Sequence, residues 1–330
     1  MLRRPLGKTG TTVSAIGLGC MGMSEFYGPG NDEQSLATLA TALDQGIDLL
    51  DTADMYGAGH NEQLLGRFLK GRRDRVVLAT KFGIVRNREN PAERRIDNSP
   101  RYVREACEAS LRRLGIDTID LYYIHRRDPS VAVEDAVGAM AELVKAGKVR
   151  YLGLSEVAPE TLRRAHAVHP ITAIQSEYSL WSRGPEREML ATCRELGVTF
   201  VAYSPLGRAM LTGAVKGEES FTPGDFRRTN PRFQGDALRQ NLRLVEGLAG
   251  FAARRGATSG QIALAWLLAK HSDVVPIPGT KRPHFVIENA AAAGITLTPE
   301  EIAALDELFD PSAVAGERYA PDRMGRIETP

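Results

Sequence analysis

The sequence has little cysteine, no long apolar run and almost no excess of either charge. Three cysteines without CxxC spacing do not form a disulfide scaffold and fit a reducing cytoplasm. The longest apolar run, residues 262–269, is far short of the roughly 18 residues that indicate a membrane span. The N-terminal MLRRPLGKTG lacks the apolar segment of a signal peptide. A net charge of +1 provides no basic face for nucleic acid. We therefore expect a cytoplasmic protein that binds neither a membrane nor nucleic acid.

The chain contains 330 residues, of which 43% are hydrophobic, enough for a large buried core. The length fits two domains of roughly 150 residues, or one α/β barrel of about 250 residues with extra loops. No segment has the composition of a linker, because apolar runs alternate with amphipathic stretches almost to the end. We therefore predict a single domain spanning residues 1–330.

About eight short apolar runs predict strands that are buried on both faces. These runs are residues 16–19, 49–51, 76–80, 119–124, 151–154, 173–175, 199–203 and 274–277. Amphipathic segments with capping residues and terminal glycines predict helices at 33–44, 100–114, 132–146 and 185–196. Such alternation favours βαβ units that close into an α/β fold of the (β/α)₈ barrel type. A doubly wound open sheet is the alternative.

Two segments lie outside this repeat. Turn residues at 7–10 between two β-like pieces predict an N-terminal β-hairpin before the first barrel strand. A polar, Gly/Pro/Arg-rich loop at 206–236 follows the seventh strand, and its length favours a functional lid over a disordered segment.

The residues from Gly17 to Gly22 match the G-x-G-x-x-G pattern of dinucleotide-binding folds. In those folds a helix follows at once and its N-terminus binds the pyrophosphate. Here Gly28, Pro29 and Gly30 prevent a helix soon after the pattern. We interpret the glycines as a turn at the end of the first strand.

Ionisable side chains end the second, third and fourth predicted strands. Asp51, Lys81 and His125 stand at these ends, and Tyr56 follows in the second loop. An ammonium group beside Tyr56 is expected to lower its pKa from about 10, and Asp51 can balance the buried charge of Lys81. His125 can then orient a substrate oxygen next to the phenol. The set indicates a proton donor for a carbonyl group, and the hydride must come from a cofactor.

Each of these residues has a simpler explanation when it is taken alone. Asp51 can cap a turn, Tyr56 can sit at a rim, and His125 can be structural. Lys81 can be solvated, or it can form a Schiff base as in an aldolase-type barrel. Their occurrence at successive strand ends favours the catalytic interpretation.

The motifs LDTADMYG, VVLATKFG, LYYIHRRD, YLGLSE, VAYSPLGR and PIPGTKR resemble the aldo-keto reductase superfamily over nearly the whole chain. The resemblance is strongest to its bacterial and fungal branch of aryl-alcohol dehydrogenase-like and pyridoxal reductase-like members. It implies NADPH-dependent reduction of an aldehyde or ketone to the alcohol. It also implies a tetrad of Asp51, Tyr56, Lys81 and His125, in which Tyr56 is the acid.

The resemblance also implies where NADP(H) binds. Ser155 and Gln175 would hold the carboxamide, Tyr203 would stack on the nicotinamide, and Glu288 and Asn289 would lie near the adenine. The loop at 204–208 would surround the pyrophosphate, and residues 279–282 would grip the 2′-phosphate. The full expected set is Gly19, Cys20, Met21, Asp51, Ser155, Gln175, Tyr203, Ser204, Pro205, Leu206, Gly207, Arg208, Ile277, Gly279, Thr280, Lys281, Arg282, Glu288 and Asn289.

The phosphate assignment also follows from the residues themselves. Gly279 and Thr280 follow a strand and precede a helical stretch at 283–293, whose N-terminus would attract an anion. Lys281 and Arg282 add two cations, and the alternative is a solvated loop with two incidental charges. We therefore expect NADPH in preference to NADH.

The chain departs from the usual family pattern at Glu156, where relatives often have Asn, and at Ala209, where Gly is common. Phe285 replaces a frequent Arg.

Four aromatic residues, Phe26, Tyr27, Phe82 and Trp181, are predicted walls of a pocket for a small carbonyl substrate. Cys20 is expected to pack rather than to do redox chemistry.

Other polar clusters are interpreted as structural. His166 and His169 have no nearby carboxylate ligand, so we predict no metal site. The mixed-charge segment 86–95 is expected to be solvated, and the alternative is that it lines the substrate mouth and favours acidic substrates. A cofactor-binding regulatory barrel without turnover and a Schiff-base lyase using Lys81 remain the alternative functions, and the oligomeric state is left open.

Overall fold

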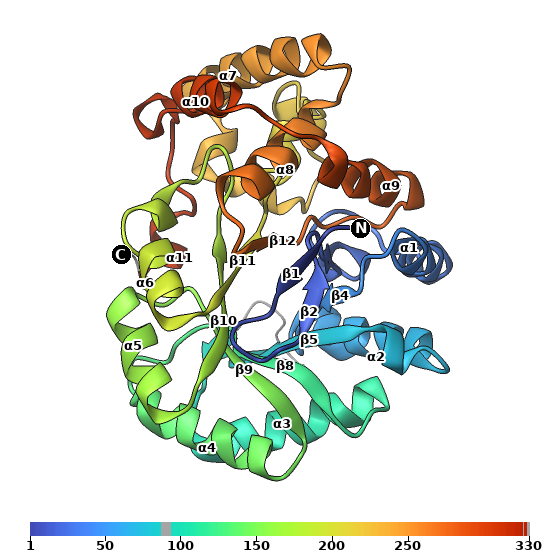
Figure 1. Cartoon of the computed structure of the whole chain (residues 1–330), viewed down its shortest axis with the longest axis vertical. Coiled ribbons are helices and arrows are strands. Elements are labelled where there is room, and N and C mark those ends of the chain that lie inside the picture. The colour runs from blue at the N-terminus through green and yellow to red at the C-terminus, as the bar shows by residue number, and fades with distance from the viewer. Residues whose placement is uncertain (87–93, 326, 329–330) are drawn as a thin grey trace.

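The computed structural model describes residues 1–86, 94–325 and 327–328, and it shows a parallel sheet surrounded by helices (Figure 1). The strand order is β3-β4-β5-β8-β9-β10-β11-β12. A parallel bridge between Gly19 and Gly279 joins the two edges, so the sheet closes into a barrel. The strands are β3 (Leu18–Gly19), β4 (Leu49–Asp51), β5 (Val77–Phe82), β8 (Ile119–Ile124), β9 (Val149–Ser155), β10 (Ile171–Glu177), β11 (Thr199–Tyr203) and β12 (Val274–Pro276). The predicted (β/α)₈ barrel is confirmed, and the open sheet is excluded.

Helices surround the barrel, and several begin at the predicted caps. Asn31 accepts a hydrogen bond from the Gln34 N–H, and Ser99 accepts one from the Tyr102 N–H. Gly115 ends α3 in the left-handed conformation. The helices are α1 (Asp32–Asp44), α2 (His60–Leu69), α3 (Pro100–Leu114), α4 (Val133–Lys145), α5 (Pro159–Val168), α6 (Met189–Leu196), α7 (Gly235–Arg254), α8 (Ser259–Lys270), α9 (Pro283–Ala291), α10 (Pro299–Leu308) and α11 (Pro321–Met324).

Two predicted helices were too long. The helix expected at 185–196 begins as α6 at Met189, because a separate 3₁₀ turn at Gly184–Glu186 precedes it. The helix expected at 283–293 ends as α9 at Ala291, and a 3₁₀ turn, Ala292–Gly294, follows. In both places apolar periodicity continues across a tighter turn.

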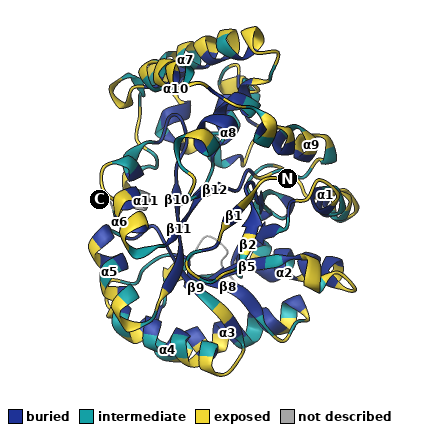
Figure 2. Ribbon diagram, in the orientation of Figure 1, coloured by how far each residue is buried: buried dark blue, intermediate teal, exposed yellow. Residues whose placement is uncertain are grey.

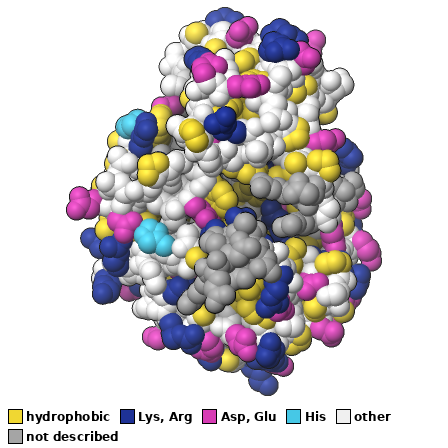
Figure 3. All heavy atoms as spheres, turned by 180° about the vertical axis from the view of Figure 1, so that it is seen from behind, with side chains coloured by type: hydrophobic (Ala, Val, Ile, Leu, Met, Phe, Trp, Pro, Cys, Tyr) yellow, Lys and Arg dark blue, Asp and Glu magenta, His cyan; other side chains and the backbone are white. Residues whose placement is uncertain are grey.

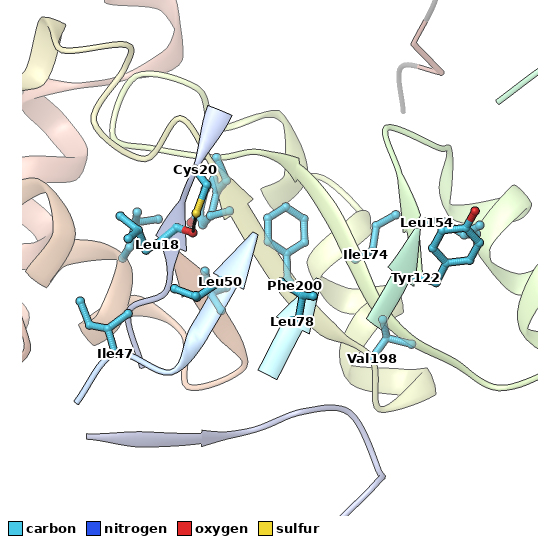
Figure 4. Packing of buried hydrophobic residues seen from close by; sticks show 14 of the residues in the cluster. Leu18, Cys20, Ile47, Leu50, Leu78, Tyr122, Leu154, Ile174, Val198 and Phe200 are labelled. Atoms are coloured by element: carbon cyan, nitrogen blue, oxygen red, sulfur yellow. Dashed lines mark hydrogen bonds between the residues drawn. The ribbon is translucent and has the colours of Figure 1, made fainter. Parts of the chain in front are cut away.

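The core has two layers that follow the alternation of side chains along each strand. On β8, Leu121 and Tyr123 point into the barrel, whereas Tyr122 and Ile124 pack against the helices. Figure 2 shows buried strands within helices whose outer faces are exposed. Figure 4 shows part of the outer layer, including Tyr122. The same alternation decides which polar side chains reach the barrel interior.

The predicted N-terminal hairpin is present and covers one end of the barrel (Figure 1). Its strands β1 (Arg3–Pro5) and β2 (Thr12–Ser14) are antiparallel. Leu6 and Val13 are fully buried and pack with the side chains of the barrel interior. The hairpin therefore seals the end opposite to the carboxyl ends of the strands.

A second hairpin follows β5 and consists of β6 (Ile84–Arg86) and β7 (Arg94–Ile96). Residues 87–93, the middle of the predicted solvated segment, lie outside the described residues. The solvation prediction was wrong for Arg86, which forms an ion pair with Glu25 and donates to the Met55 carbonyl. Because β6 and β7 pair as an antiparallel hairpin, the Arg86 end of the segment contacts other protein residues.

The segment 206–236 consists of turns and short 3₁₀ helices that pack on the C-terminal part of the chain. Arg208 and Asn230 both donate to the Arg318 carbonyl, and Arg232 donates to the Gly316 carbonyl. The segment is ordered and contributes to the cavity described below. Its role as a lid stays a prediction.

Candidate active site

A cavity of about 590 Å³ lies at the carboxyl ends of the barrel strands. Residues within or following each of the eight barrel strands line it, including those of a hairpin that follows β5, together with parts of the long segment 206–236. Figure 3 shows this face, with hydrophobic and basic side chains gathered around a central hollow. This position is where (β/α)₈ enzymes place their chemistry.

Three of the four predicted catalytic side chains form one hydrogen-bonded cluster. Lys81 Nζ donates to Asp51 Oδ1 at 2.5 Å, to the Thr52 carbonyl at 2.7 Å and to Tyr56 Oη at 3.5 Å. Asp51 ends β4, and Lys81 points inward from the neighbouring β5. The pairing of β4 with β5 thus brings Asp51 and Lys81 together although they are far apart in the sequence.

The Lys81 ammonium is held in its charged form although it has no solvent exposure. Burial lowers the pKa of Lys81, but Asp51 and Tyr56 outweigh that effect and raise it above its usual value. Burial raises the pKa of Asp51, and Lys81 opposes this effect. Gln175 Nε2 donates to the other Asp51 oxygen at 2.7 Å. The carboxylate therefore has partners on both oxygens, as a buried charge requires.

The predicted lowering of the Tyr56 pKa was wrong. Burial raises the pKa of the phenol, and the opposing Lys81 ammonium does not overcome it. The loss of solvation has the larger effect on the phenol, and the neighbouring charge the smaller. Tyr56 is therefore a neutral phenol at physiological pH, and it still holds the proton that a general acid must donate.

His125 lies beside Tyr56, with the two ring centroids 5.7 Å apart in an edge-to-face arrangement. Burial lowers the pKa of His125 well below its usual value, and Lys81 and Arg126 lower it further. The imidazole is therefore neutral. A neutral ring has one N–H to donate and one nitrogen to accept, so it can orient a substrate oxygen without supplying the reaction's proton.

The expected cofactor residues lie along the same cavity, except for Cys20 and Gly207. Cys20 is fully buried in the outer core, and burial strongly raises its thiol pKa. The structure therefore supports the expected packing role of Cys20. Gly207 adopts a φ of 57° and lies next to Trp181, so it affects the conformation of the loop without lining the cavity.

The two cations expected at the 2′-phosphate lie at the start of α9. Lys281 Nζ donates to the carbonyls of Tyr27 and Pro29, at 2.8 and 2.7 Å. Within the described part of the chain, neither Lys281 nor Arg282 forms an ion pair with a carboxylate. Arg282 is the residue immediately before α9, so both charges stand at a helix N-terminus.

Arg208, expected near the pyrophosphate, is already bound to a carboxylate. Its guanidinium pairs with Glu177 at 2.8 Å. Burial opposes ionisation of Glu177, but Arg208, Arg318 and Arg232 together lower its pKa to about 2. Glu156, which replaces the usual Asn, accepts hydrogen bonds from the Glu177 N–H and from Arg318. Glu156 thus belongs to this buried charge cluster and is absent from the cavity wall.

Two of the four predicted wall aromatics were wrong. Phe26 and Tyr27 line the cavity, but Phe82 and Trp181 do not. Phe82 follows the inward-pointing Lys81, so it points outward and stacks on Tyr122. Trp181 packs edge-on against Phe233.

Sequence reasoning missed several cavity residues, including Arg126 and Tyr319. Arg126 follows His125, and that adjacency was an available signal. The Tyr319 hydroxyl lies 2.9 Å from that of Tyr203, although the two residues are 116 positions apart in the sequence, and no local pattern indicates such a contact.

Other features of the described residues limit the alternatives. No group of three or more metal-ligating side chains occurs among residues 1–86, 94–325 and 327–328. His166 lies on α5 and accepts from the Ile171 N–H, while His169 follows the helix. No described helix is both long and apolar enough to cross a membrane.

Comparisons with known proteins identify the family of the chain. The model of the aldo/keto reductase family matches residues 15–310. The chain is 45% identical to aldo-keto reductase yakc of Schizosaccharomyces pombe, over 98% of this chain and 96% of that protein. That relative's name specifies NADP(+).

Solved structures share the fold. A glycerol dehydrogenase from Gluconobacter oxydans aligns with a TM-score of 0.87 and 29% identity, covering 97% of this chain and 98% of that one. An aldo/keto reductase from Klebsiella pneumoniae, in complex with NADP and acetate, aligns with a TM-score of 0.73 and 29% identity, covering 97% and 99%. The extent and identity of these matches establish that the chain belongs to the aldo/keto reductase family.

Proposed function

We propose that the protein reduces an aldehyde or ketone to the alcohol with NADPH, and that Tyr56 donates the proton. The observation that carries this proposal is the buried Lys81 ammonium, which contacts both Asp51 and the Tyr56 hydroxyl at the cavity floor. A neutral phenol beside a fixed cation can release its proton to a developing alkoxide. The cation then stabilises the phenolate that remains.

The cavity fits NADP(H). At one end stand Lys281 and Arg282, at the N-terminus of α9 and without a carboxylate partner among the described residues. They suit the dianionic 2′-phosphate. Tyr203 and Ser155 line the cavity toward the tetrad, where an aromatic ring and a hydroxyl suit the nicotinamide and its carboxamide. The NADP(+) in one relative's name and the NADP bound in a similar solved structure support the same cofactor.

Bound NADPH would supply the hydride, and the side chains of the chain supply the rest. Tyr56 gives its proton to the carbonyl oxygen, and Lys81 shares the charge left on the phenol oxygen. Asp51 keeps Lys81 ionised, and Gln175 fixes the orientation of Asp51. His125, as a neutral imidazole, positions the carbonyl oxygen beside Tyr56.

The lyase alternative requires a neutral amine that is free to attack a carbonyl. Lys81 instead directs its three N–H bonds toward three acceptors. A Schiff base would require breaking its ion pair with Asp51 in a buried site. The geometry therefore favours the reductase.

The proposal is tested by following NADPH absorbance with a panel of aldehydes, for the wild type and Tyr56→Phe. We expect the variant to bind NADPH with unchanged affinity in a fluorescence titration and to lose at least about 100-fold in kcat, the loss typical of general acid removal. Retained turnover would exclude Tyr56 as the acid. NADPH binding without oxidation by any aldehyde would support the regulatory alternative.

A further inference from the structure

Arg126 is a cavity residue whose charge the proposed reaction does not use. It follows His125 directly after β8, and it lines the cavity together with Tyr56. In the closed barrel, three strands separate β8 from β12 in either direction. Arg126 therefore stands across the barrel from Lys281 and Arg282, at the catalytic end of the cavity.

The contacts of Arg126 leave its charge unbalanced. Its Nη1 atom donates to the His125 carbonyl at 2.7 Å and to Ser155 Oγ at 3.2 Å. Nε and Nη2 make no hydrogen bond with the described residues, and no carboxylate among them lies within ion-pair distance of the guanidinium. The nearby Glu156 carboxylate is bound by Arg318 and by the Glu177 N–H. Two neutral oxygens are thus the only partners of a full positive charge within the described part of the chain.

Two other guanidinium groups on this cavity have carboxylate partners within the protein. Arg208 pairs with Glu177 at 2.8 Å, and Arg227 pairs with Asp225 at 2.7 Å. A cation at a desolvated site is costly unless an anion accompanies it. The 2′-phosphate of the proposed cofactor accounts for Lys281 and Arg282. It cannot account for Arg126, which lies at the opposite side of the barrel.

We propose that Arg126 binds a carboxylate group of the substrate, so that the preferred substrates are carbonyl compounds that also carry a carboxylate. This inference rests on the proposed reductase function. A guanidinium presents parallel N–H groups that match the two oxygens of a carboxylate. Because Arg126 adjoins His125 in the chain, a carboxylate bound there would hold the carbonyl of the same small molecule near His125 and Tyr56.

Apolar side chains line the cavity as well, together with Arg94 and Arg95 of β7. Its walls include Met21, Phe26, Met55, Ile84 and Ile96. Such walls favour a hydrophobic body between the two polar groups. The substrate class is therefore an oxo acid or formyl acid with an aromatic or aliphatic body, rather than a sugar or another polyhydroxylated carbonyl compound.

The test compares a formyl acid with its neutral ester. Rates of NADPH oxidation are measured with ortho-formylbenzoate and with its methyl ester, for the wild type, Arg126→Met and Arg126→Lys. We expect the wild type to prefer the acid, and Arg126→Met to lose about 10- to 100-fold in kcat/KM for the acid, mainly through KM. The kcat/KM for the ester should change by less than about threefold in Arg126→Met. Arg126→Lys keeps the charge and should recover part of the preference.

The matched control is Arg127→Met, which removes the same charge one residue away. Arg127 forms an ion pair with Glu328 and does not line the cavity. The control should keep the preference for the acid. NADPH titration of Arg126→Met separates substrate from cofactor binding, and an affinity loss there would assign Arg126 to the cofactor instead.

Three results would overturn the inference while leaving the reductase proposal intact. In the first, the wild type has the same kcat/KM for the acid and the ester. In the second, Arg126→Met lowers kcat/KM equally for the two compounds. In the third, Arg127→Met loses the preference for the acid. If neither compound is reduced, the reductase proposal fails for this substrate class. Calorimetric titration of benzoate into the NADPH-bound protein then still decides the role of Arg126, because equal binding by Arg126→Met would refute carboxylate recognition.

Discussion

Replacing Lys81 by Met tests the electrostatic core of the site without any assumption about the substrate. Lys81 Nζ neutralises Asp51, and both side chains are buried. After the substitution Asp51 keeps, among the described residues, only the Gln175 amide as a partner of its carboxylate. Breaking a buried ion pair from one side costs about 3–5 kcal/mol, because the remaining charge is left uncompensated. We expect a loss of that size in the free energy of unfolding, measured by guanidinium chloride titration at neutral pH.

The pH dependence of that loss identifies its cause. Burial without a cation raises the pKa of Asp51 above its unfolded value of about 4. A raised carboxyl pKa destabilises the folded state at high pH, and this destabilisation disappears as the pH falls through the folded pKa. The loss should therefore be larger near pH 8 than near about pH 5.

A second substitution provides the control. Asp51→Asn in the Lys81→Met background removes the stranded charge and should recover about 2 kcal/mol or more. A loss that is independent of pH and is not recovered by Asp51→Asn would refute the ion-pair account and indicate a simple packing defect.

Two further predictions concern the cofactor end of the cavity and its loop. Replacing both Lys281 and Arg282 by Ala should raise the KM for NADPH by about 10- to 100-fold and leave the KM for NADH within about threefold. Equal effects on the two cofactors, in initial-rate kinetics, would exclude 2′-phosphate recognition by this pair. Ala209→Gly should raise the unfolding free energy by up to about 1 kcal/mol, because Ala209 has a φ of 74°, a conformation that disfavours a side chain. A lowered Tm in calorimetry would contradict this explanation.

The barrel was predictable because a short apolar run in the sequence indicates each strand. Apolar runs such as Leu49–Asp51 and Thr199–Tyr203 have the bounds that the structure assigns to β4 and β11. Strand alternation also predicts the direction of Phe82. Lys81 must point inward to serve the site, so its neighbour Phe82 must point outward into the helical layer.

The site was less predictable where it depends on burial or on distant segments. The direction of the Tyr56 pKa shift depends on how completely the phenol loses water, which no sequence pattern reports. Tyr319 reaches Tyr203 from a C-terminal segment without repeating apolar periodicity. Arg126 follows the end of β8, where strand alternation no longer indicates the direction of a side chain.

The charge cluster around Glu177 limits how the predicted lid could move. Arg208 near the start of the segment 206–236 pairs with this buried carboxylate, and Arg232 near its end lies 3.7 Å from it. Arg318, from the C-terminal part of the chain, approaches the same carboxylate. Opening either end would separate a buried arginine from Glu177, which is more costly than exposing neutral polar groups. Any closure motion must therefore be confined to the central turns, where the exposed residues of this segment are concentrated.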